Sequence, residues 1–185
     1  MDKVIAFRTD TFYGLGADPF NAVAVARIRA LKGRGDDKPI LLLISDLDQV
    51  GRLIAERTDE FNRMAERFWP GPLTIIGKAV DDLPHEVTAG TGTVGVRLPD
   101  NEDVRRLVRD YGGVLTATSA NPARRGPARS AEEVRRYFPE GIDLIIDGGL
   151  VTAIQPSTVV DATTSPPRVI REAAIRARDL IAAGE

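Results

Sequence analysis

Cysteine is absent from this chain of 185 residues, and histidine occurs only once, as His85. The absence of cysteine excludes disulfides, thiolate metal sites and a cysteine nucleophile. A single histidine gives little support to a transition-metal site or a Ser/His/Asp triad, and the polar stretch around His85 is typical of a loop. Any chemistry is therefore left to cations, hydroxyls and backbone amides, and we predict no protein-held metal.

A strong net charge is also lacking, because 25 Lys and Arg residues are balanced by 27 Asp and Glu residues. The sequence thus offers no global attraction to nucleic acid or to an anionic membrane, and any anion site must be local. No apolar run approaches the ~18 residues of a spanning helix, and the first ten residues lack the apolar core of a signal peptide. We expect a cytoplasmic protein with no membrane partner.

What is present is an ordinary globular composition, with 43% hydrophobic and 28% charged residues. Short apolar runs alternate with helix-period segments, which favours the α/β class. We predict a single domain over residues 1–185, with an open, twisted, mixed or parallel sheet of about six to eight strands and helices on its faces. Strands are expected at residues 4–7, 40–44, 73–77, 94–99, 114–121, 143–147, 157–161 and 168–170, and helices near 19–31, 60–68, 101–111, 130–138 and 173–183.

Local signals mark several boundaries. Asp18 and Pro19 suit an N-cap and a first helical position, and "YGLG" (13–16) has the composition of a turn. Asp100 or Asn101 can cap the helix that follows. Ser130 and Glu133 have the spacing of a capping box. The apolar run 40–44 shows no polar alternation, which predicts a strand covered on both faces.

Four polar motifs follow directly on predicted strands or helices: "TDT" (9–11), "KGR" (32–34), "TSAN" (118–121) and "STVVD" (157–161). Ligands of open α/β sheets gather outside the strand ends, so these motifs are expected to converge there. Each motif alone also suits a turn or a cap. Lys32 suits a helix C-terminus, whereas Lys32 and Arg34 together suit a polyphosphate clamp.

In their order along the chain, these motifs resemble those of the YrdC/TsaC-type threonylcarbamoyl-AMP synthases. The resemblance runs from about residue 4 to residue 176 and covers six segments. They are "RTDTFYGLGAD", "KGRGDDKPILLL", "WPGPLTII", "TVGVRLP", "TSAN" and "STVVD" followed by "RVIREAAI".

The resemblance implies an open α/β sheet around a concave basic cavity, in the short single-domain form of the family. It implies an enzyme that uses ATP, L-threonine and bicarbonate to make threonylcarbamoyl-adenylate and pyrophosphate. This is the first step of threonylcarbamoylation of adenosine 37 in tRNA, and other proteins then transfer the threonylcarbamoyl group. Mg²⁺ would accompany the phosphates.

Carried over by motif, the resemblance places Thr11, Arg97 and Ser157 at the threonine pocket, where a guanidinium suits the carboxylate. Lys32 and Arg34 would act on the nucleotide phosphates as catalytic cations, and no general base is assigned. The residues implied around ATP are Arg34, Lys38, Thr93, Ser119, Asn121 and Arg171. "SANPARRG" departs from the family's S-A-N-x-S-G, so the hydroxyl of the second serine is missing there.

Two other readings stay open from the sequence. An arginine cluster could bind RNA phosphates and make the chain an RNA-binding module without synthase activity; its members are Arg124, Arg125, Arg129, Arg135 and Arg136. Alternatively, the chain could be a carbamoyl-adenylate-handling domain like the one inside a hydrogenase-maturation carbamoyltransferase. Dependence on threonine separates these readings.

Overall fold

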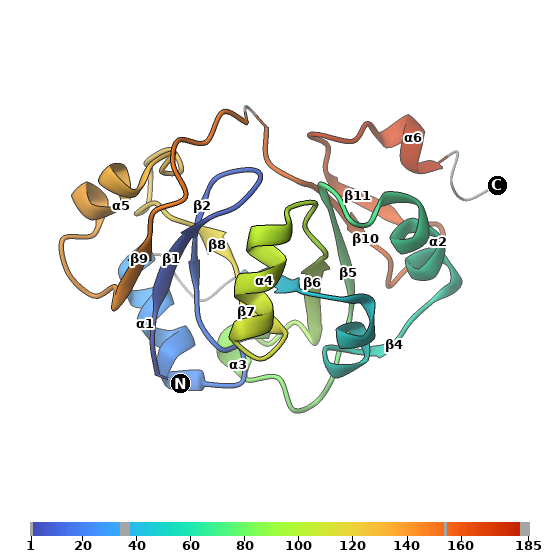
Figure 1. Ribbon diagram of the computed structural model, residues 1–185. Coiled ribbons are helices and arrows are strands. Elements are labelled where there is room, and N and C mark those ends of the chain that lie inside the picture. Colours follow the sequence, from blue (N-terminus) through green and yellow to red (C-terminus); the bar gives the residue numbers. More distant parts are fainter. Residues whose placement is uncertain (1, 34–37, 154, 182–185) are drawn as a thin grey trace.

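The computed structural model describes residues 2–33, 38–153 and 155–181, and it alternates strands and helices as predicted (Figure 1). The strands are β1 (Ile5–Arg8), β2 (Tyr13–Gly16), β3 (Leu42–Ile44), β4 (Ile54–Glu56), β5 (Leu73–Ala79), β6 (Thr93–Arg97), β7 (Val114–Thr116), β8 (Thr118–Ser119), β9 (Leu144–Ile146), β10 (Thr158–Asp161) and β11 (Arg168–Arg171). The helices are α1 (Ala22–Lys32), α2 (Asp59–Phe68), α3 (His85–Thr88), α4 (Glu102–Asp110), α5 (Ala131–Tyr137) and α6 (Ala177–Ile181), with a 3₁₀ helix η1 (Leu47–Arg52).

The strands form two open mixed sheets where the sequence predicted one. The smaller has the order β8-β2-β1-β9, and the larger has the order β11-β10-β5-β6-β3-β7, with β4 added beside β5. Both contain parallel and antiparallel pairs: β3 runs parallel to β6 and antiparallel to β7, and β1 runs antiparallel to β2 and parallel to β9. The α/β class with open mixed sheets is thus confirmed, and the number of strands is larger than predicted.

The core lies on both faces of β3. Leu42 and Ile44 belong to the larger apolar cluster, which includes the buried side chains of α1, α2 and β5. Leu43 points the other way, into a second cluster with Phe7 of β1 and Val104 of α4. The prediction of a strand covered on both faces is confirmed, and α4 packs over β3 and β7 where the two sheets meet.

The prediction of a turn at "YGLG" is wrong, because these residues form β2. Gly14 pairs with Phe7 and Gly16 with Ile5 in an antiparallel hairpin, and all four residues of β2 are buried. A β carbon on Gly16 would lie 2.6 Å from Cε1 of Phe7 and 2.9 Å from the carbonyl oxygen of Thr116. Glycine serves close packing of a strand here and does not serve a turn.

The start of α1 also differs from the prediction. Asn21 is the N-cap, and its side-chain oxygen accepts from the backbone N–H of Ala24 at 3.0 Å. Asp18 instead accepts from the N–H of Phe20 at 3.0 Å, in a turn before the helix. The polar stretch around His85, predicted as a loop, contains the one-turn helix α3, and the last helix begins at Ala177, later than predicted.

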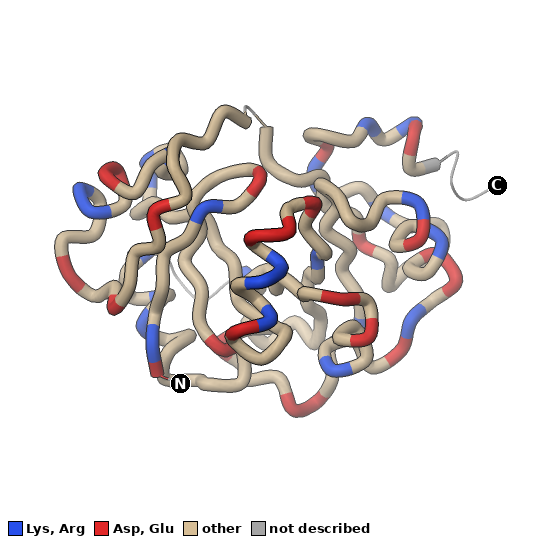
Figure 2. Tube along the Cα trace, viewed as in Figure 1, with Lys and Arg blue, Asp and Glu red and all other residues tan. Residues whose placement is uncertain are grey.

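Two other caps are as predicted or nearly so. Asn101 caps α4 by accepting from the N–H of Val104 at 3.0 Å. Ser130 caps α5 by accepting from the N–H of Glu133 at 3.2 Å, but the Glu133 carboxylate accepts from the N–H of Arg129 and so does not close the box on Ser130 itself. Figure 2 shows that both helices carry charges of both signs.

Candidate active site

A cavity of about 260 Å³ opens where the β1–β2 hairpin faces the ends of β6, β8 and β10. Its only charged residues, among those that the structure describes, are two arginines. Five of the residues predicted from the motifs line it: Thr11, Arg97, Ser119, Ser157 and Arg171. Segments far apart in the sequence thus meet at one site. Of the four motifs expected to converge, "TDT", "TSAN" and "STVVD" contribute lining residues, whereas the described part of "KGR" does not.

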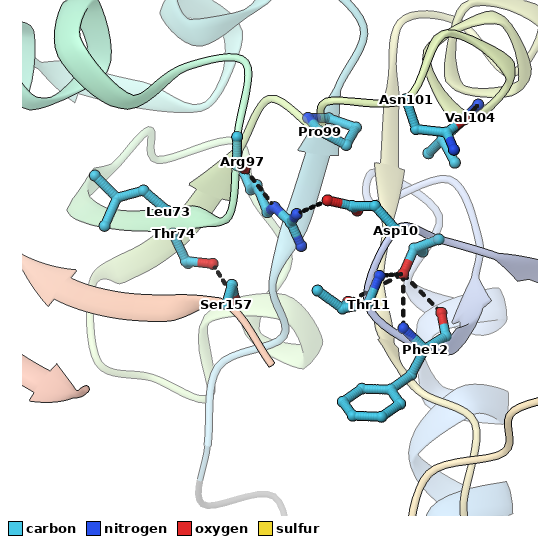
Figure 3. A network of polar contacts seen from close by, with 12 residues as sticks. Asp10, Thr11, Phe12, Leu73, Thr74, Arg97, Pro99, Asn101, Val104 and Ser157 are labelled. Atoms are coloured by element: carbon cyan, nitrogen blue, oxygen red, sulfur yellow. Dashed lines mark hydrogen bonds and ion pairs between the residues drawn. The ribbon is translucent and has the colours of Figure 1, made fainter. Parts of the chain in front are cut away.

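The loop between β1 and β2 is organised by the hydroxyl of Thr9. This hydroxyl donates to the carbonyl oxygen of Phe12 at 2.6 Å and accepts from the N–H groups of Thr11 and Phe12, both at 3.1 Å. The Thr11 hydroxyl lies 3.1 Å from that of Thr9. This local network fixes Thr11 at the cavity wall, as Figure 3 shows.

Arg97, at the end of β6, is 2% exposed. Its Nε donates to the carbonyl oxygen of Gly71 at 2.9 Å, and its Nη2 donates to Oδ2 of Asp10 (Figure 3). Burial lowers the pKa of the Arg97 guanidinium, and the carboxylate of Asp10 opposes this shift. Protein groups therefore occupy the Nε and Nη2 edge of the guanidinium, and its Nη1 atom is left to bind an incoming carboxylate.

Sequence reasoning had missed Asp10. It lies inside the "TDT" motif, but nothing local indicates that its partner is a residue 87 positions away. The "TDT" motif could have indicated Asp10. A carboxylate between two threonines in a turn after a strand must either be paired or be exposed to solvent.

Ser157 and Arg171 form the opposite wall. The hydroxyl of Ser157 lies 3.0 Å from that of Thr74, a pair drawn in Figure 3. Arg171 donates from Nε and Nη2 to the carbonyl oxygen of Ser157, at 3.1 and 2.9 Å. Partial burial lowers the pKa of Arg171. Its guanidinium is thereby held at the cavity while part of it stays open to solvent.

Lys32 and the "TSAN" motif meet as predicted, in an arrangement that the sequence did not specify. The Lys32 side chain is buried, and its ammonium donates to the carbonyl oxygens of Ser119 and Asn121 and to their side chains. Lys32 does not line the cavity. It anchors the segment that presents Ser119, so its catalytic role remains a prediction.

Asn121 also acts within the protein in this structure. Its amide nitrogen donates to the carbonyl oxygens of Arg125 at 2.6 Å and Pro122 at 3.3 Å, and its side-chain oxygen accepts from the hydroxyl of Ser119 at 2.5 Å. These bonds fold the "SANPARRG" segment back on itself. Asn121 is not among the residues that line the cavity, so its contact with ATP stays a prediction.

The remaining predicted ATP residues are not brought to this cavity. Thr93 begins β6, about 13 Å along the strand from Arg97 at ~3.3 Å per residue, and lines a separate cavity beside Lys78. Lys38 is exposed and precedes Pro39, which does line the site. Arg34, predicted as the central phosphate ligand, lies outside the described residues.

Among the residues that the structure describes, no three His, Asp or Glu side chains lie together in a way that could hold a metal ion. None of the helices in this part of the chain has the length and apolar character needed to cross a membrane.

The chain is similar in sequence to one protein family and to proteins named threonylcarbamoyl-AMP synthase. The Sua5/YciO/YrdC family model, described as "Telomere recombination", matches residues 1–173. A threonylcarbamoyl-AMP synthase of Halorhodospira halophila is 39% identical over 85% of this chain and 83% of its own length.

Solved structures give the same result for the fold. Pyrococcus abyssi Sua5 complexed with L-threonine superposes with a TM-score of 0.93 at 36% identity, over 98% of this chain and 54% of that one. E. coli YciO superposes with a TM-score of 0.83 at 28% identity, over 93% of this chain and 84% of that one. This chain therefore spans about half of the archaeal protein and most of the others. On the match of its sequence and its fold, the chain belongs to the Sua5/YciO/YrdC family.

Proposed function

We propose that this chain is a threonylcarbamoyl-AMP synthase, a nucleotidyltransferase that uses ATP, L-threonine and bicarbonate and releases pyrophosphate. The observation that carries this proposal is the meeting of Thr11, Arg97 and Ser157 at one cavity in a chain of this family. Relatives in the family bear this name, and P. abyssi Sua5 was solved with L-threonine. The product would supply the first intermediate of tRNA threonylcarbamoylation at adenosine 37 to downstream transferase proteins.

The threonine would bind between the hairpin and β10. The free side of the Arg97 guanidinium suits the carboxylate, and the hydroxyls of Thr11 and Ser157 can hydrogen-bond the polar groups of the amino acid. Arg171 and Ser119 line the same cavity and would extend the site toward the nucleotide. Lys38, Thr93, Asn121 and Arg34 are retained as proposed ATP residues on the family's motifs alone.

The chemistry proposed for this site needs no histidine. The amine of threonine condenses with bicarbonate to a carbamate and water, and a carbamate oxygen attacks the α-phosphorus of ATP while pyrophosphate leaves. Negative charge then builds on the phosphate oxygens, so positioning and cations supply the acceleration. Arg34 and Arg171 are the cations proposed to face these oxygens, and Lys32 would contribute by holding Ser119 in place.

Magnesium is proposed to enter as the complex with ATP. The described residues offer no group of three acidic or histidine side chains for it, whereas the phosphates of ATP provide the oxygen ligands that Mg²⁺ prefers. A cytoplasmic location is likewise proposed here and rests on the composition of the sequence.

The test is pyrophosphate release from Mg-ATP and bicarbonate, with and without L-threonine. We expect the wild type to depend on threonine, Arg34→Ala to lose nearly all activity, and Thr11→Val to raise the KM for threonine about tenfold through one lost hydrogen bond. Thr152→Val is the matched control, because Thr152 is exposed and lies outside the cavity. Release that is indifferent to threonine would contradict the proposal.

The alternative of an RNA-binding module is less favoured by the contacts of its arginines. Arg125 and Arg136 both lie over the ring of Tyr137, at 5.6 and 5.9 Å from its centroid. Arg136 also pairs with Glu133, and Arg129 donates to two backbone carbonyls. RNA binding by a folded wild type that releases no pyrophosphate would nevertheless favour this alternative, and a tRNA contact beside the synthase activity stays a prediction.

A further inference from the structure

One carboxylate oxygen of Asp10 is buried and accepts no hydrogen bond from the described residues. Its Oδ2 receives the hydrogen bond from Arg97, while its Oδ1 is shielded from solvent and has no hydrogen-bond partner among the described residues. Leaving a charged acceptor unpaired in a protein interior is costly, and native structures rarely do so without a functional reason. Oδ1 is therefore a position where a donor from a ligand would be favourable.

The location of this acceptor suggests which ligand supplies the donor. Asp10 stands between Thr9 and Thr11, which both line the cavity, and it points at Arg97, which lines the cavity too (Figure 3). Its side chain is 21% exposed, although Asp10 is not itself among the residues that line the cavity. The Asp10–Arg97 pair thus presents an anion and a cation next to each other at one wall.

An α-amino acid carries the complementary pair, an ammonium and a carboxylate on one carbon. The described residues that line the cavity include two arginines and no acid, so an ammonium would meet only positive charge there without Asp10. A cation that loses its water needs a paired anion, and the carboxylate of Asp10, which is paired with the lining residue Arg97, can supply it.

We propose that Oδ1 of Asp10 accepts a hydrogen bond from the ammonium group of the amino-acid substrate, while Arg97 binds the carboxylate of the same molecule. The inference rests on the proposed function and deepens it, because it assigns the residue that distinguishes an amino acid from a hydroxy acid at this site. Asp10 is thus a substrate-binding residue as well as the partner of Arg97.

The experiment compares Asp10→Asn with wild type for two ligands by calorimetry: L-threonine, and (R)-3-hydroxybutanoate, which keeps the carboxylate, the hydroxyl and the methyl group but has no amine. We expect threonine affinity to fall about 10- to 100-fold, as for a lost charge-assisted hydrogen bond, and 3-hydroxybutanoate affinity to change by less than about twofold. The KM for threonine in pyrophosphate release should rise in parallel.

Two further variants serve as controls. Asp46→Asn breaks an exposed ion pair with Arg109, neither of which lines the cavity, and should leave the binding of both ligands unaffected. Asp10→Glu keeps the charge and should recover part of the threonine affinity. Should 3-hydroxybutanoate bind even the wild type too weakly to measure, this recovery decides: recovery supports the inference and its absence overturns it.

The other outcomes are distinct. An equal loss for both ligands would mean that Asp10 acts only by holding Arg97, and no loss for threonine would mean that it does not touch the amine; either result overturns the inference while the synthase activity stands. A wild type that neither binds threonine nor releases pyrophosphate overturns the proposed function, and this inference with it.

Discussion

Gly16 of β2 packs closely against Phe7 of its own sheet and against β7 of the other sheet. The β carbon of any other residue would meet the ring of Phe7, the backbone of Thr116 and the side chain of Leu115, all within 3.0 Å. Backbone atoms cannot move aside cheaply in a packed core. The strand β2, and with it the loop that presents Thr11, depends on the missing side chain at this position.

We expect Gly16→Ala to lower the free energy of unfolding by about 1–3 kcal/mol through overpacking. Gly51→Ala is the matched control, because a β carbon there has no neighbour within 4 Å, and it should be neutral or slightly stabilising. Urea denaturation of the two variants measures the difference. Equal stabilities would show that the hairpin can shift to accept the methyl group.

Single residues also show the limit of sequence reasoning about the site. Thr11, Arg97 and Ser157 could be found because each lies in a motif at a strand end. The pairing of Asp10 with Arg97 could not, since it joins residues 87 positions apart. Nor could the burial of the Lys32 ammonium against Ser119, because a lysine at a helix end is usually solvated.

At the scale of elements, the features set by local chemistry were predicted best. The cap at Asn101 and the helix ending before Trp69 follow from short-range signals and are present, and the strand predicted over 40–44 is present over its last three residues, Leu42–Ile44. The glycine-rich composition of "YGLG" concealed the strand β2. The division into two sheets depends on pairing between distant segments, which local sequence patterns do not show. The start of α1 was misplaced because two acceptors, Asp18 and Asn21, compete within one turn.

The N-cap of α4 provides a test at this scale. Asn101→Ala removes the oxygen that accepts from the N–H of Val104, and we expect a loss of about 1 kcal/mol in the free energy of unfolding. Asn62→Ala, inside α2, is the control and should be neutral or stabilising, because alanine favours a helix interior. Since α4 covers the junction of the two sheets, a loss well above this value would indicate that the cap also holds the junction.

Across the whole molecule, Asp143 ties the beginning of the chain to a segment near β9. Its Oδ2 accepts from the N–H of Val4 at 2.7 Å and lies 3.0 Å from Nη1 of Arg27 on α1. Arg27 in turn donates to the carbonyl oxygens of Asp2 and Gly141. Three segments, at the N-terminus, in α1 and before β9, thus share one carboxylate.

The contacts of Asp143 predict a dependence of stability on pH. The Arg27 guanidinium and the Val4 N–H hold the pKa of Asp143 below its usual range, so its ionised form is favoured by folding. The contribution is present above the unfolded pKa of about 3.9 and is lost as pH falls through the lower folded pKa. We expect Asp143→Asn to cost about 1 kcal/mol at pH 7 and progressively less as the pH falls below about 3.9.

Denaturation curves of both proteins between pH 2 and 8 measure this. Asp48→Asn, at an exposed carboxylate that accepts from the side-chain amide of its neighbour Gln49, is the control and should change little over the range. A constant difference between wild type and Asp143→Asn at every pH would mean that the loss comes from packing and not from charge.

The walls of the cavity come from widely separated parts of the chain: the hairpin near its beginning, the end of β6 in its middle and β10–β11 near its end. During synthesis, the first two are made long before Ser157 and Arg171 leave the ribosome. β10 must then add in parallel beside β5, a non-local pairing that forms late. A nascent chain therefore has no complete substrate site until its last strands have docked, and activity would mark the end of folding.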